Sequence, residues 1–456
     1  MKSDCRAADV AIVGGGFSGT MMAAELARRG IGAVLIEGGG RAGRGTAYST
    51  PEDVHLLNVP AGKMSAWADR PDHFAEAVAG EGYGPADFVP RRRYGAYLSG
   101  ILRGAGVEVV DQAAIRAEPD GEGWSVDLAD GRSIAANALV LAQGNQPPGR
   151  LGFARGISGQ LFVNDPWSDE GRAAVAGVAA SGGDVLIIGT GLTMVDVVLS
   201  LDEAGHRGWI VALSRRGLAP RAHAAHEAAP VELGELPQGS VVALWRWLRQ
   251  RGAAAGWRAA VDSLRPHSHA LWQALDAREQ RRFIRHARPW WDVHRHRIAP
   301  EVAGRIAAMI GEERLEIVAG RIAGMRKADG ALRVAIDRRG SPLTPLASGE
   351  SPSPARGEGL EFALAVNCTG PLGSIANSAD GVLGSLFGPG LAQPDALGMG
   401  LEVDRASRVA GAPRAWALGP LTKGRFWEIV AVPDIRGQVA AVADDIAVEL
   451  EHAVQS

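Results

Sequence analysis

The sequence predicts an α/β protein with two sheets of mainly parallel strands, each covered by helices. The chain has 456 residues, which is too long for one ordinary core and indicates two or more domains. Its 61 glycines are roughly twice the usual ~7% share, so backbone must often pass close to something. An apolar strand, a glycine-rich turn and a helix also occur twice. The predicted fold class is therefore α/β with two Rossmann-type dinucleotide-binding domains and a helical insertion in the second.

The first repeat begins with an apolar run at 10–13, which is too short for a helix and is typical of a buried parallel strand. A glycine-rich turn at 14–19 follows, and a helix of small residues then runs to about Arg29. A second strand at 33–36 ends at Glu37. These segments predict a βαβ unit.

The second repeat begins with a strand at 184–188, a turn at 189–194 and a helix to about Ala204. Its second strand, at 209–213, ends in Ser214-Arg215-Arg216. The two repeats therefore share one order of elements but end their second strands with opposite charge.

Later segments complete both units. Residues 124–136 predict a hairpin with an Asp-Gly turn that continues into a strand at 139–144. In the second half, strands at 331–337 and 360–365 form the matching pair and lead into 366–370. The stretch from Ala415 onward gives a further strand, which we expect to complete the first sheet, and then a C-terminal helix.

These patterns predict domain boundaries. The first domain covers 1–165 and 366–456, and the second covers 166–365 with a helical insertion at 220–300. A mobile loop is expected at 340–359, because residues 340–358 hold four prolines, four serines and no aromatic residue.

Charge and cysteine content exclude several classes of protein. The formal net charge is -3, which gives no electrostatic case for nucleic acid or an anionic membrane as the main partner. No apolar stretch approaches the ~18 residues that a transmembrane helix needs, and no secretory signal is evident. The chain has two cysteines and no CxxC pair, so we expect a cytoplasmic protein without a redox-active dithiol.

The first glycine-rich turn has the pattern Gly-x-Gly-x-x-Gly at Gly14, Gly16 and Gly19. Such glycines allow a tight turn, close approach of a pyrophosphate and packing of the helix on the strand. The helix N-terminus then stabilises the phosphate charge. Glu37 can hydrogen-bond the hydroxyls of an adenosine ribose and would repel a 2′-phosphate, so the first unit predicts FAD.

The second turn has Gly189 and Gly191 but Met194 in place of the third glycine. Its strand end carries Ser214, Arg215 and Arg216. A hydroxyl and two guanidinium groups suit a ribose 2′-phosphate, because a guanidinium binds phosphate through two hydrogen bonds. The second unit therefore predicts NADPH, with a solvated basic turn as the alternative.

Two histidine-rich segments allow other interpretations. Residues 223–227 suggest a metal site, but they match no metalloprotease pattern and lack a third ligand, so a loop beside the cofactor is favoured and no metal is expected. Residues 290–297 hold two tryptophans beside His294, Arg295 and His296. They indicate either a helix end with a solvated basic face or a lid whose histidines move protons.

On these motifs the chain resembles the bacterial FAD/NAD(P)-binding oxidoreductases with two Rossmann domains, which are distant relatives of class B flavin monooxygenases and N-hydroxylases. The resemblance covers about 10–447 and rests on residues 14–19, 45–48, 55–59, 64–65, 214–217, 294–297, 367–371 and 427–428. Two departures stand out. Pro420 follows Gly419 where related flavoproteins carry an acid, and 163–167 lack the Phe-x-Gly-x-x-x-His pattern of class B monooxygenases.

The motifs and the resemblance together imply a set of site residues. The cofactor-binding candidates are Gly14, Gly16, Phe17, Ser18, Gly19, Glu37, Gly45, Thr46, Tyr48, Asn58, Val59, Met64, Gln143, Gly144, Gly189, Gly191, Thr193, Ser214, Arg215, Arg216, Thr369, Gly370, Gly419 and Trp427. The catalytic candidates are His294, Arg295 and His296.

The leading functional hypothesis is an FAD enzyme that takes hydride from NADPH and passes electrons to molecular oxygen, hydroxylating a small organic substrate. A urate-type aromatic hydroxylase is a narrower version that related proteins suggest. The alternatives are an NADPH-dependent flavin oxidase or reductase without hydroxylation, and a non-catalytic flavin-binding redox sensor. The substrate and the oligomeric state do not follow from the sequence.

Overall fold

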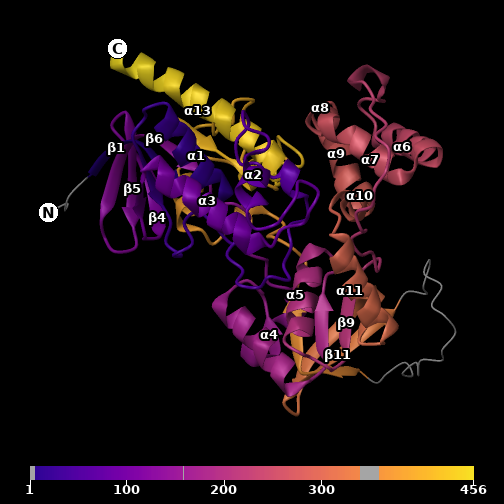
Figure 1. Cartoon of the computed structure of the whole chain (residues 1–456). Coiled ribbons are helices and arrows are strands. Elements are labelled where there is room, and N and C mark those ends of the chain that lie inside the picture. Colours follow the sequence, from indigo (N-terminus) through magenta and orange to yellow (C-terminus); the bar gives the residue numbers. More distant parts are fainter. Residues whose placement is uncertain (1–5, 158, 339–358, 456) are drawn as a thin grey trace. The chain divides into compact units, whose positions relative to one another are not determined.

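The computed structural model describes residues 6–157, 159–338 and 359–455 (Figure 1). The loop expected at 340–359 lies outside the described residues except for Gly359. Contacts divide the chain into two compact units. Unit 1 comprises 1–146, 227–286 and 372–456, and unit 2 comprises 147–226 and 287–371.

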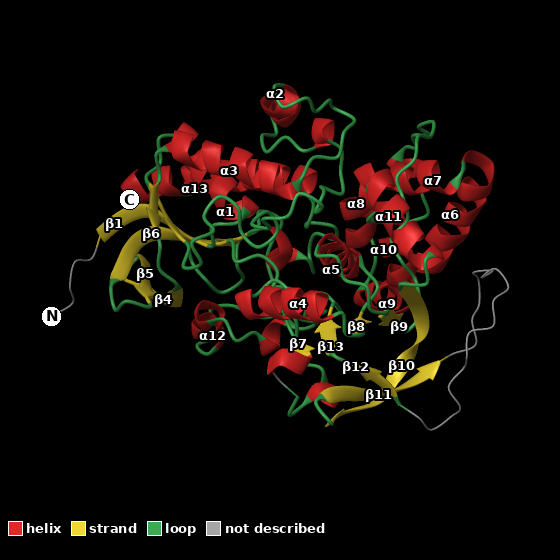
Figure 2. Ribbon diagram, turned by 60° about the horizontal axis from the view of Figure 1, so that its bottom comes forward, coloured by secondary structure: helices red, strands yellow, loops and turns green. Residues whose placement is uncertain are grey.

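Unit 1 is built on a seven-stranded sheet with the order β3-β2-β1-β6-β5-β4, in which β14 also pairs with β6. Figure 2 shows β1, β6, β5 and β4 of this sheet. Its strands are β1 (Arg6–Val13), β2 (Ala33–Ile36), β3 (Glu108–Val110), β4 (Ala114–Asp120), β5 (Gly123–Leu128), β6 (Ser133–Leu141) and β14 (Ala415–Ala417). Its helices are α1 (Phe17–Arg28), α2 (His73–Ala79), α3 (Arg91–Ala105), α6 (Val241–Ala255), α7 (Trp257–Leu264), α8 (Ser268–Gln273), α9 (Ala277–Arg282), α12 (Gly381–Phe387) and α13 (Val432–Gln455). The predicted hairpin is confirmed as β5 and β6, and β14 completes this sheet as expected.

The core of unit 1 lies on both faces of this sheet. The parallel strands β1, β2 and β6 are apolar and buried over 10–13, 34–36 and 138–141, because helices or loops cover these parts on each side. The helices α1, α3 and α13 pack together over one face (Figure 1). Helix α12 and the chain around 391–421 pack on the other face, against side chains of the sheet that include Trp124 and Val126 of β5. The ends of β1 and β6 are therefore held rigidly where the glycine-rich turn begins.

Unit 2 has a second seven-stranded sheet with the order β12-β11-β10-β9-β8-β13-β7. Its strands are β7 (Phe162–Val163), β8 (Val185–Ile188), β9 (Ile210–Ser214), β10 (Leu315–Ala328), β11 (Ala331–Arg338), β12 (Leu360–Phe362) and β13 (Leu364–Asn367). Its helices are α4 (Asp169–Ser181), α5 (Leu192–Glu203), α10 (Arg288–Arg295) and α11 (Pro300–Gly311). The run β10-β9-β8-β13 repeats the order β3-β2-β1-β6 of unit 1, so the predicted pair of Rossmann-type domains is confirmed.

The contact boundaries differ from the predicted ones in two respects. The chain changes unit at 146/147 and 371/372, because β13 pairs with β8 and β7 and stays with the second sheet. The helical segment 227–286 interrupts the sequence between β9 and β10 of unit 2, as an insertion should, but it packs within unit 1. Aromatic contacts with the C-terminal region hold it there.

None of the helices in the described ranges is both long and apolar enough to cross a membrane.

Candidate functional site

The turn after β1 runs against the end of β6. Gly14 has a φ of +106°, and a Cβ atom there would lie 2.5 Å from the carbonyl oxygen of Ala142. Its N–H donates to Ile36 O at 2.9 Å, while Ala142 N–H donates to Val13 O at 2.8 Å. The turn is thus fixed to the ends of β1, β2 and β6, and only glycine fits its first position.

Helix α1 begins directly after this turn. Gly16 is its N-cap residue, with no side chain capping the first N–H groups. Thr20 N–H makes the first helical bond, to Gly16 O, so the N–H groups before it are not used within the helix. A Cβ atom at Gly19 would lie 1.8 Å from Gly14 O, so the helix packs directly on the turn. This glycine cradle and the N–H groups at the helix start, which are not used within the helix, fit the pyrophosphate of a dinucleotide.

Glu37 lies beside the cradle at the end of β2. Its Oε2 accepts a hydrogen bond from Gly15 N–H at 3.0 Å, and its Oε1 accepts one from Gly39 N–H at 2.8 Å. Each carboxylate oxygen can accept more than one hydrogen bond. The carboxylate is therefore oriented by the backbone and still able to receive the hydroxyls of a ribose.

The segment around Gly45 lies against the same turn. Gly45 has a φ of +54°, and a Cβ atom there would lie 2.8 Å from Gly16 Cα. The ring of Tyr48 packs on Tyr94 with a centroid distance of 4.7 Å, and burial raises the pKa of Tyr48 to about 12. Tyr48 is therefore a neutral phenol at physiological pH, while Thr46 is exposed.

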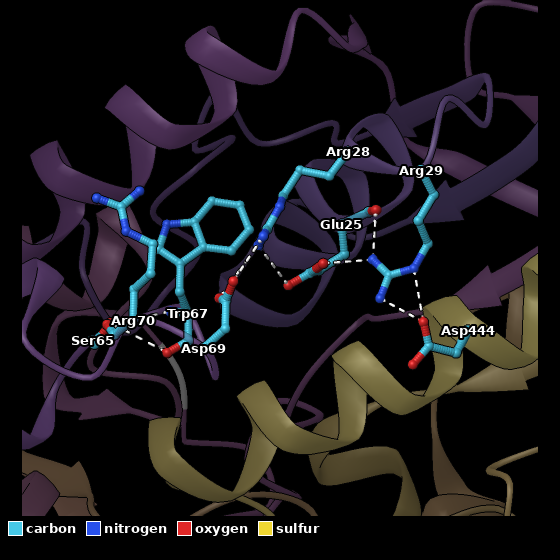
Figure 3. A network of polar contacts seen from close by, with 8 residues as sticks. All are labelled: Glu25, Arg28, Arg29, Ser65, Trp67, Asp69, Arg70 and Asp444. Atoms are coloured by element: carbon cyan, nitrogen blue, oxygen red, sulfur yellow. Dashed lines mark hydrogen bonds and ion pairs between the residues drawn. The ribbon is translucent and has the colours of Figure 1, made fainter.

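Asn58, Val59 and Met64 lie on the loop that follows, where Met64 is buried and the other two are half-buried. The chain just after Met64 is anchored by the polar network of Figure 3, which comprises Glu25, Arg28, Arg29, Ser65, Trp67, Asp69, Arg70 and Asp444. Arg28 of α1 pairs with Asp69 at 2.8 Å, and its guanidinium lies 4.7 Å from the ring centre of Trp67.

The same network also joins α1 to α13. Arg29 bonds both the buried Glu25 at 2.5 Å and Asp444 of α13 at 2.7 Å. From α13, Arg436 Nη1 donates to Ser65 O at 2.8 Å. Contacts with both α1 and α13 therefore hold the segment after Met64 in place.

Two further cofactor-binding candidates, Gln143 after β6 and Gly419 after β14, lie close to the glycine turn and the start of α1. Gln143 follows β6, and its Nε2 donates to Asp380 Oδ1 at 3.0 Å. Its Oε1 is buried and has no hydrogen-bond partner among the described residues, which leaves an acceptor for a ligand hydroxyl. Gly419 has a φ of +59°, and a Cβ atom there would lie 2.8 Å from Ser18 Oγ, at the start of α1.

The sequence did not point to the two side chains that hold these candidates. Asp380 orients Gln143 and also caps α12 by accepting from Leu383 N–H at 3.0 Å. Gln438 accepts from Gly419 N–H at 2.8 Å. An aspartate just before a helix is a recognisable cap signal, but nothing local in the sequence marks Gln438.

Trp427 faces the helical segment of unit 1. It stacks on Trp272 with a centroid distance of 4.8 Å and meets Phe283 edge-on at 5.2 Å. Trp272 Nε1 donates to Gly424 O at 2.8 Å. The sequence placed Trp427 among the cofactor contacts, and the structure shows it docking the segment 227–286 onto the region before α13.

Unit 2 repeats the geometry of the first turn at Gly189. Its φ is +111°, and a Cβ atom there would lie 2.3 Å from Cys368 O. Gly189 N–H donates to Leu213 O at 2.8 Å, and Cys368 N–H donates to Ile188 O at 2.7 Å. Gly191 caps α5 without a side-chain bond, as Gly16 caps α1. Thr369 and Gly370 follow β13 at the positions that Gln143 and Gly144 hold after β6.

The strand end of unit 2 differs in its side chains. Ser214 Oγ lies 2.8 Å from Thr190 Oγ1 and accepts from Gly217 N–H at 3.0 Å, so hydroxyl groups fix this turn. Arg215 is exposed and Arg216 is half-buried, and neither pairs with a carboxylate among the described residues. Thr193 is half-buried in the first turn of α5.

His294, Arg295 and His296 lie at the end of α10 in unit 2. Burial lowers the pKa of His294, and Arg221 and Arg297 lower it further. Its Nδ1 lies 2.7 Å from Trp290 O, so in the neutral ring Nδ1 carries the proton and Nε2 is the acceptor. The chain that continues from Arg216 reaches these residues, since Arg221 N–H donates to Val293 O at 2.9 Å.

Gly14, Gly16, Gly19, Glu37, Gly45, Gln143 and Gly419 therefore lie around one glycine turn, and Gly189 and Gly191 form the corresponding turn of unit 2. No group of three or more His, Cys, Asp or Glu side chains in the described part of the chain could hold a metal ion.

Comparison with known proteins agrees with this geometry. Residues 11–146 match the FAD-NAD(P)-binding family. The chain is similar to ornithine N-hydroxylase from Kutzneria sp. 744, solved with reduced FAD, NADP+ and L-ornithine, at 16% identity and a TM-score of 0.64 over 97% of this chain and 100% of that chain. It is also similar to L-lysine 6-monooxygenase from Pseudomonas syringae, at 18% identity and a TM-score of 0.64 over 98% and 100%.

A neighbour with different chemistry has the same fold. Bacillithiol disulfide reductase from Staphylococcus aureus is 11% identical, with a TM-score of 0.56 over 97% of this chain and 99% of that chain. At such identities the likeness establishes the fold, and the sites must be judged from their residues. Residues 11–146 thus match an FAD-NAD(P)-binding domain, and the whole chain has the fold of the two-domain FAD/NAD(P) flavoproteins to which it is similar.

Proposed function

We propose that this chain is an FAD-dependent oxidoreductase that takes hydride from NADPH and hydroxylates a small organic substrate with molecular oxygen. The observation that carries the proposal is the pair of matching glycine turns with opposite charge at their strand ends, Glu37 in unit 1 and Arg215 with Arg216 in unit 2. Two dinucleotides of different phosphate content match this arrangement.

In unit 1, the N–H groups at the start of α1 would bind the FAD pyrophosphate, and Glu37 would accept the hydroxyls of its adenosine ribose. Gln143 Oε1 would accept a hydrogen bond from another hydroxyl of the dinucleotide. When bound, FAD supplies the acceptor for hydride and the reaction with oxygen.

In unit 2, the start of α5 would bind the NADPH pyrophosphate in the same way. The guanidinium groups of Arg215 and Arg216 would bind the 2′-phosphate, which NADH lacks. Ser214 is already bonded to Gly217 and Thr190, so we assign it to holding this turn and its arginines in place.

His294 is the residue of unit 2 best suited to move a proton. Because its pKa is lowered by burial, it is neutral near pH 7 and can accept a proton at Nε2. Arg295 and His296 follow His294 at the end of α10. We propose that this group serves the substrate side of the reaction.

The reaction can be tested by its stoichiometry. Each turnover would consume one NADPH, one proton and one O2, and would yield NADP+, water and a substrate that has gained one oxygen atom. We would supply L-ornithine, L-lysine, other amines and urate-type aromatic compounds to the FAD-saturated protein. NADPH oxidation, peroxide and a product heavier by one oxygen would be measured together.

The outcomes separate the alternatives. Hydroxylated product with little peroxide supports the proposal. One peroxide per NADPH with every candidate would instead indicate an NADPH-dependent flavin oxidase. A flavin that NADPH does not reduce would indicate a non-catalytic flavin-binding protein, such as a redox sensor.

A further inference from the structure

A surface pocket of about 470 Å³ lies on the outer face of α3 in unit 1, against the turn that precedes Gly45. It is lined by Ala42, Arg44, Arg92, Ala96, Ser99, Leu102 and Arg103. Gly45 Cα lies against the glycine cradle, whereas the pocket opens on the α3 side of the same turn. None of the candidate cofactor residues lines it.

The pocket concentrates positive charge. Three of its lining residues are arginines, and none is an aspartate or a glutamate. Arg44 donates to Gly40 O at 3.2 Å, and neither Arg44 nor Arg103 forms an ion pair with a described residue. Arg92 pairs with Asp53, which lies outside the lining. In a chain with a net charge of -3, this local excess attracts anions.

The fold holds these groups in place. Positions 92, 96, 99 and 103 recur at helical spacing, so they share one face of α3. Gly43 has a φ of +83°, and a Cβ atom there would lie 2.8 Å from Ser99 Cα, so the turn is pressed onto the helix. Both walls of the pocket are therefore set by backbone contacts and not by mobile side chains alone.

We propose that this pocket binds a small molecule that carries two or more phosphate groups. The guanidinium groups of Arg44 and Arg103 can each bind phosphate through two hydrogen bonds. Arg92 adds the N–H groups that do not bind Asp53, and Ser99 adds a hydroxyl. Ala42, Ala96 and Leu102 offer an apolar surface to the rest of the ligand. The volume is within the range of about 300–1,000 Å³ that small-molecule sites occupy. The proposal does not depend on the redox function.

The test uses inorganic pyrophosphate as the probe and the full chain saturated with FAD, so that the cofactor's own phosphate site is filled. Isothermal titration at low ionic strength should detect binding. The double variant Arg44→Gln, Arg103→Gln should weaken it at least roughly tenfold, because the probe would lose two charged hydrogen-bond donors.

A matched control lies on the same helix. Arg93 pairs with Glu81 at 3.1 Å and does not line the pocket, so Arg93→Gln should bind pyrophosphate as the parent does. Arg44 and Arg103 are exposed, so we expect their variant to keep the thermal unfolding midpoint and the flavin content of the parent.

Four results would overturn the proposal: no binding to the FAD-saturated chain, equal binding by the double variant, binding that FAD abolishes, or inorganic sulfate binding as tightly as pyrophosphate. The third would place the probe in the FAD phosphate site. The fourth would indicate a basic surface without selectivity.

Discussion

The glycine turns of the two units share one backbone and differ in what surrounds it. Gly14 and Gly189 have φ values of +106° and +111°, and a Cβ atom at either position would clash with a carbonyl oxygen of the neighbouring strand end. Their N–H groups donate to Ile36 O and Leu213 O at 2.9 and 2.8 Å. The backbone contacts of the first glycine with the neighbouring strand ends are therefore the same in both units.

The differences lie in side chains. At the third position, Gly19 touches Gly14 O, whereas the buried Met194 fills the corresponding place in unit 2. At the strand end, backbone N–H groups orient the carboxylate of Glu37, whereas hydroxyl groups fix Ser214 and leave two arginines to follow. The shared backbone suits any pyrophosphate, and under our proposal the strand end selects which dinucleotide is bound.

Removing the first glycine should have the largest effect. Gly14→Ala and Gly189→Ala would each force a side chain into a positive φ, at about 1–3 kcal/mol, and onto a carbonyl oxygen at 2.5 or 2.3 Å. We expect Gly14→Ala to abolish flavin binding. Gly189→Ala should keep the flavin but lose its reduction by NADPH. The flavin-to-protein absorbance ratio and the rate of flavin bleaching measure the two effects.

The second glycine provides the matched control. A Cβ atom at Gly16 has its nearest neighbour at 3.8 Å, and one at Gly191 has none within 4 Å. Gly16→Ala and Gly191→Ala should therefore fold with an unchanged thermal midpoint and weaken only the respective dinucleotide. If Gly14→Ala retained full flavin, the close contact with Ala142 would not be essential to the cradle.

The arginines of unit 2 should have the next largest effect. In the double variant Arg215→Gln, Arg216→Gln, the 2′-phosphate of NADPH would lose its charged partners. Such hydrogen bonds contribute about 1.5–3 kcal/mol, so the KM for NADPH should rise roughly tenfold to a hundredfold. The KM for NADH should stay constant, which steady-state kinetics with both nucleotides would show.

Arg207 is a suitable control, because it is also exposed but precedes β9 at the opposite end of the strand from Ser214. Arg207→Gln should leave both constants unchanged. Equal losses for NADPH and NADH in the double variant would mean that the arginines bind the shared pyrophosphate and do not select the 2′-phosphate.

Many of the features compared above, namely the two glycine turns and the residues at the strand ends, could be predicted from local sequence. The two turns, Glu37 and Ser214-Arg215-Arg216 follow from short-range rules, since a buried strand, glycines and a strand-end side chain lie within one βαβ unit. The hairpin β5–β6 follows from its Asp-Gly turn for the same reason.

Contacts between distant parts of the chain could not be read in this way. Gln438 reaches Gly419 from a helix without a motif, and Trp272 stacks on Trp427 across most of the C-terminal half. The stacking of Trp272 on Trp427 depends on how the segment 227–286 packs within unit 1, although its place in the sequence suggests the other unit. The basic pocket on α3 was missed for a similar reason, because Arg44 and Arg103 meet only in three dimensions.

The smallest effect should come from neutralising the strand end of unit 1. Glu37→Gln keeps one oxygen that can accept from Gly15 N–H, while its NH2 group cannot accept from the exposed Gly39 N–H. It also loses the negative charge that strengthens hydrogen bonds from ribose hydroxyls. The difference between charged and neutral acceptors is about 1 kcal/mol, so the Kd for FAD should rise roughly fivefold. Fluorescence titration of the apoprotein with FAD measures this change.

The counterpart in unit 2 makes the interpretation specific. Ser214→Ala removes the hydroxyl that accepts from Gly217 N–H, so it should disturb the arginine turn and the KM for NADPH without altering the Kd for FAD. Glu37→Gln should do the reverse. If both substitutions changed both constants, the strand ends would be acting through the folding of the whole chain. Separate effects would mean that each strand end selects its own dinucleotide, although the two turns share the same backbone.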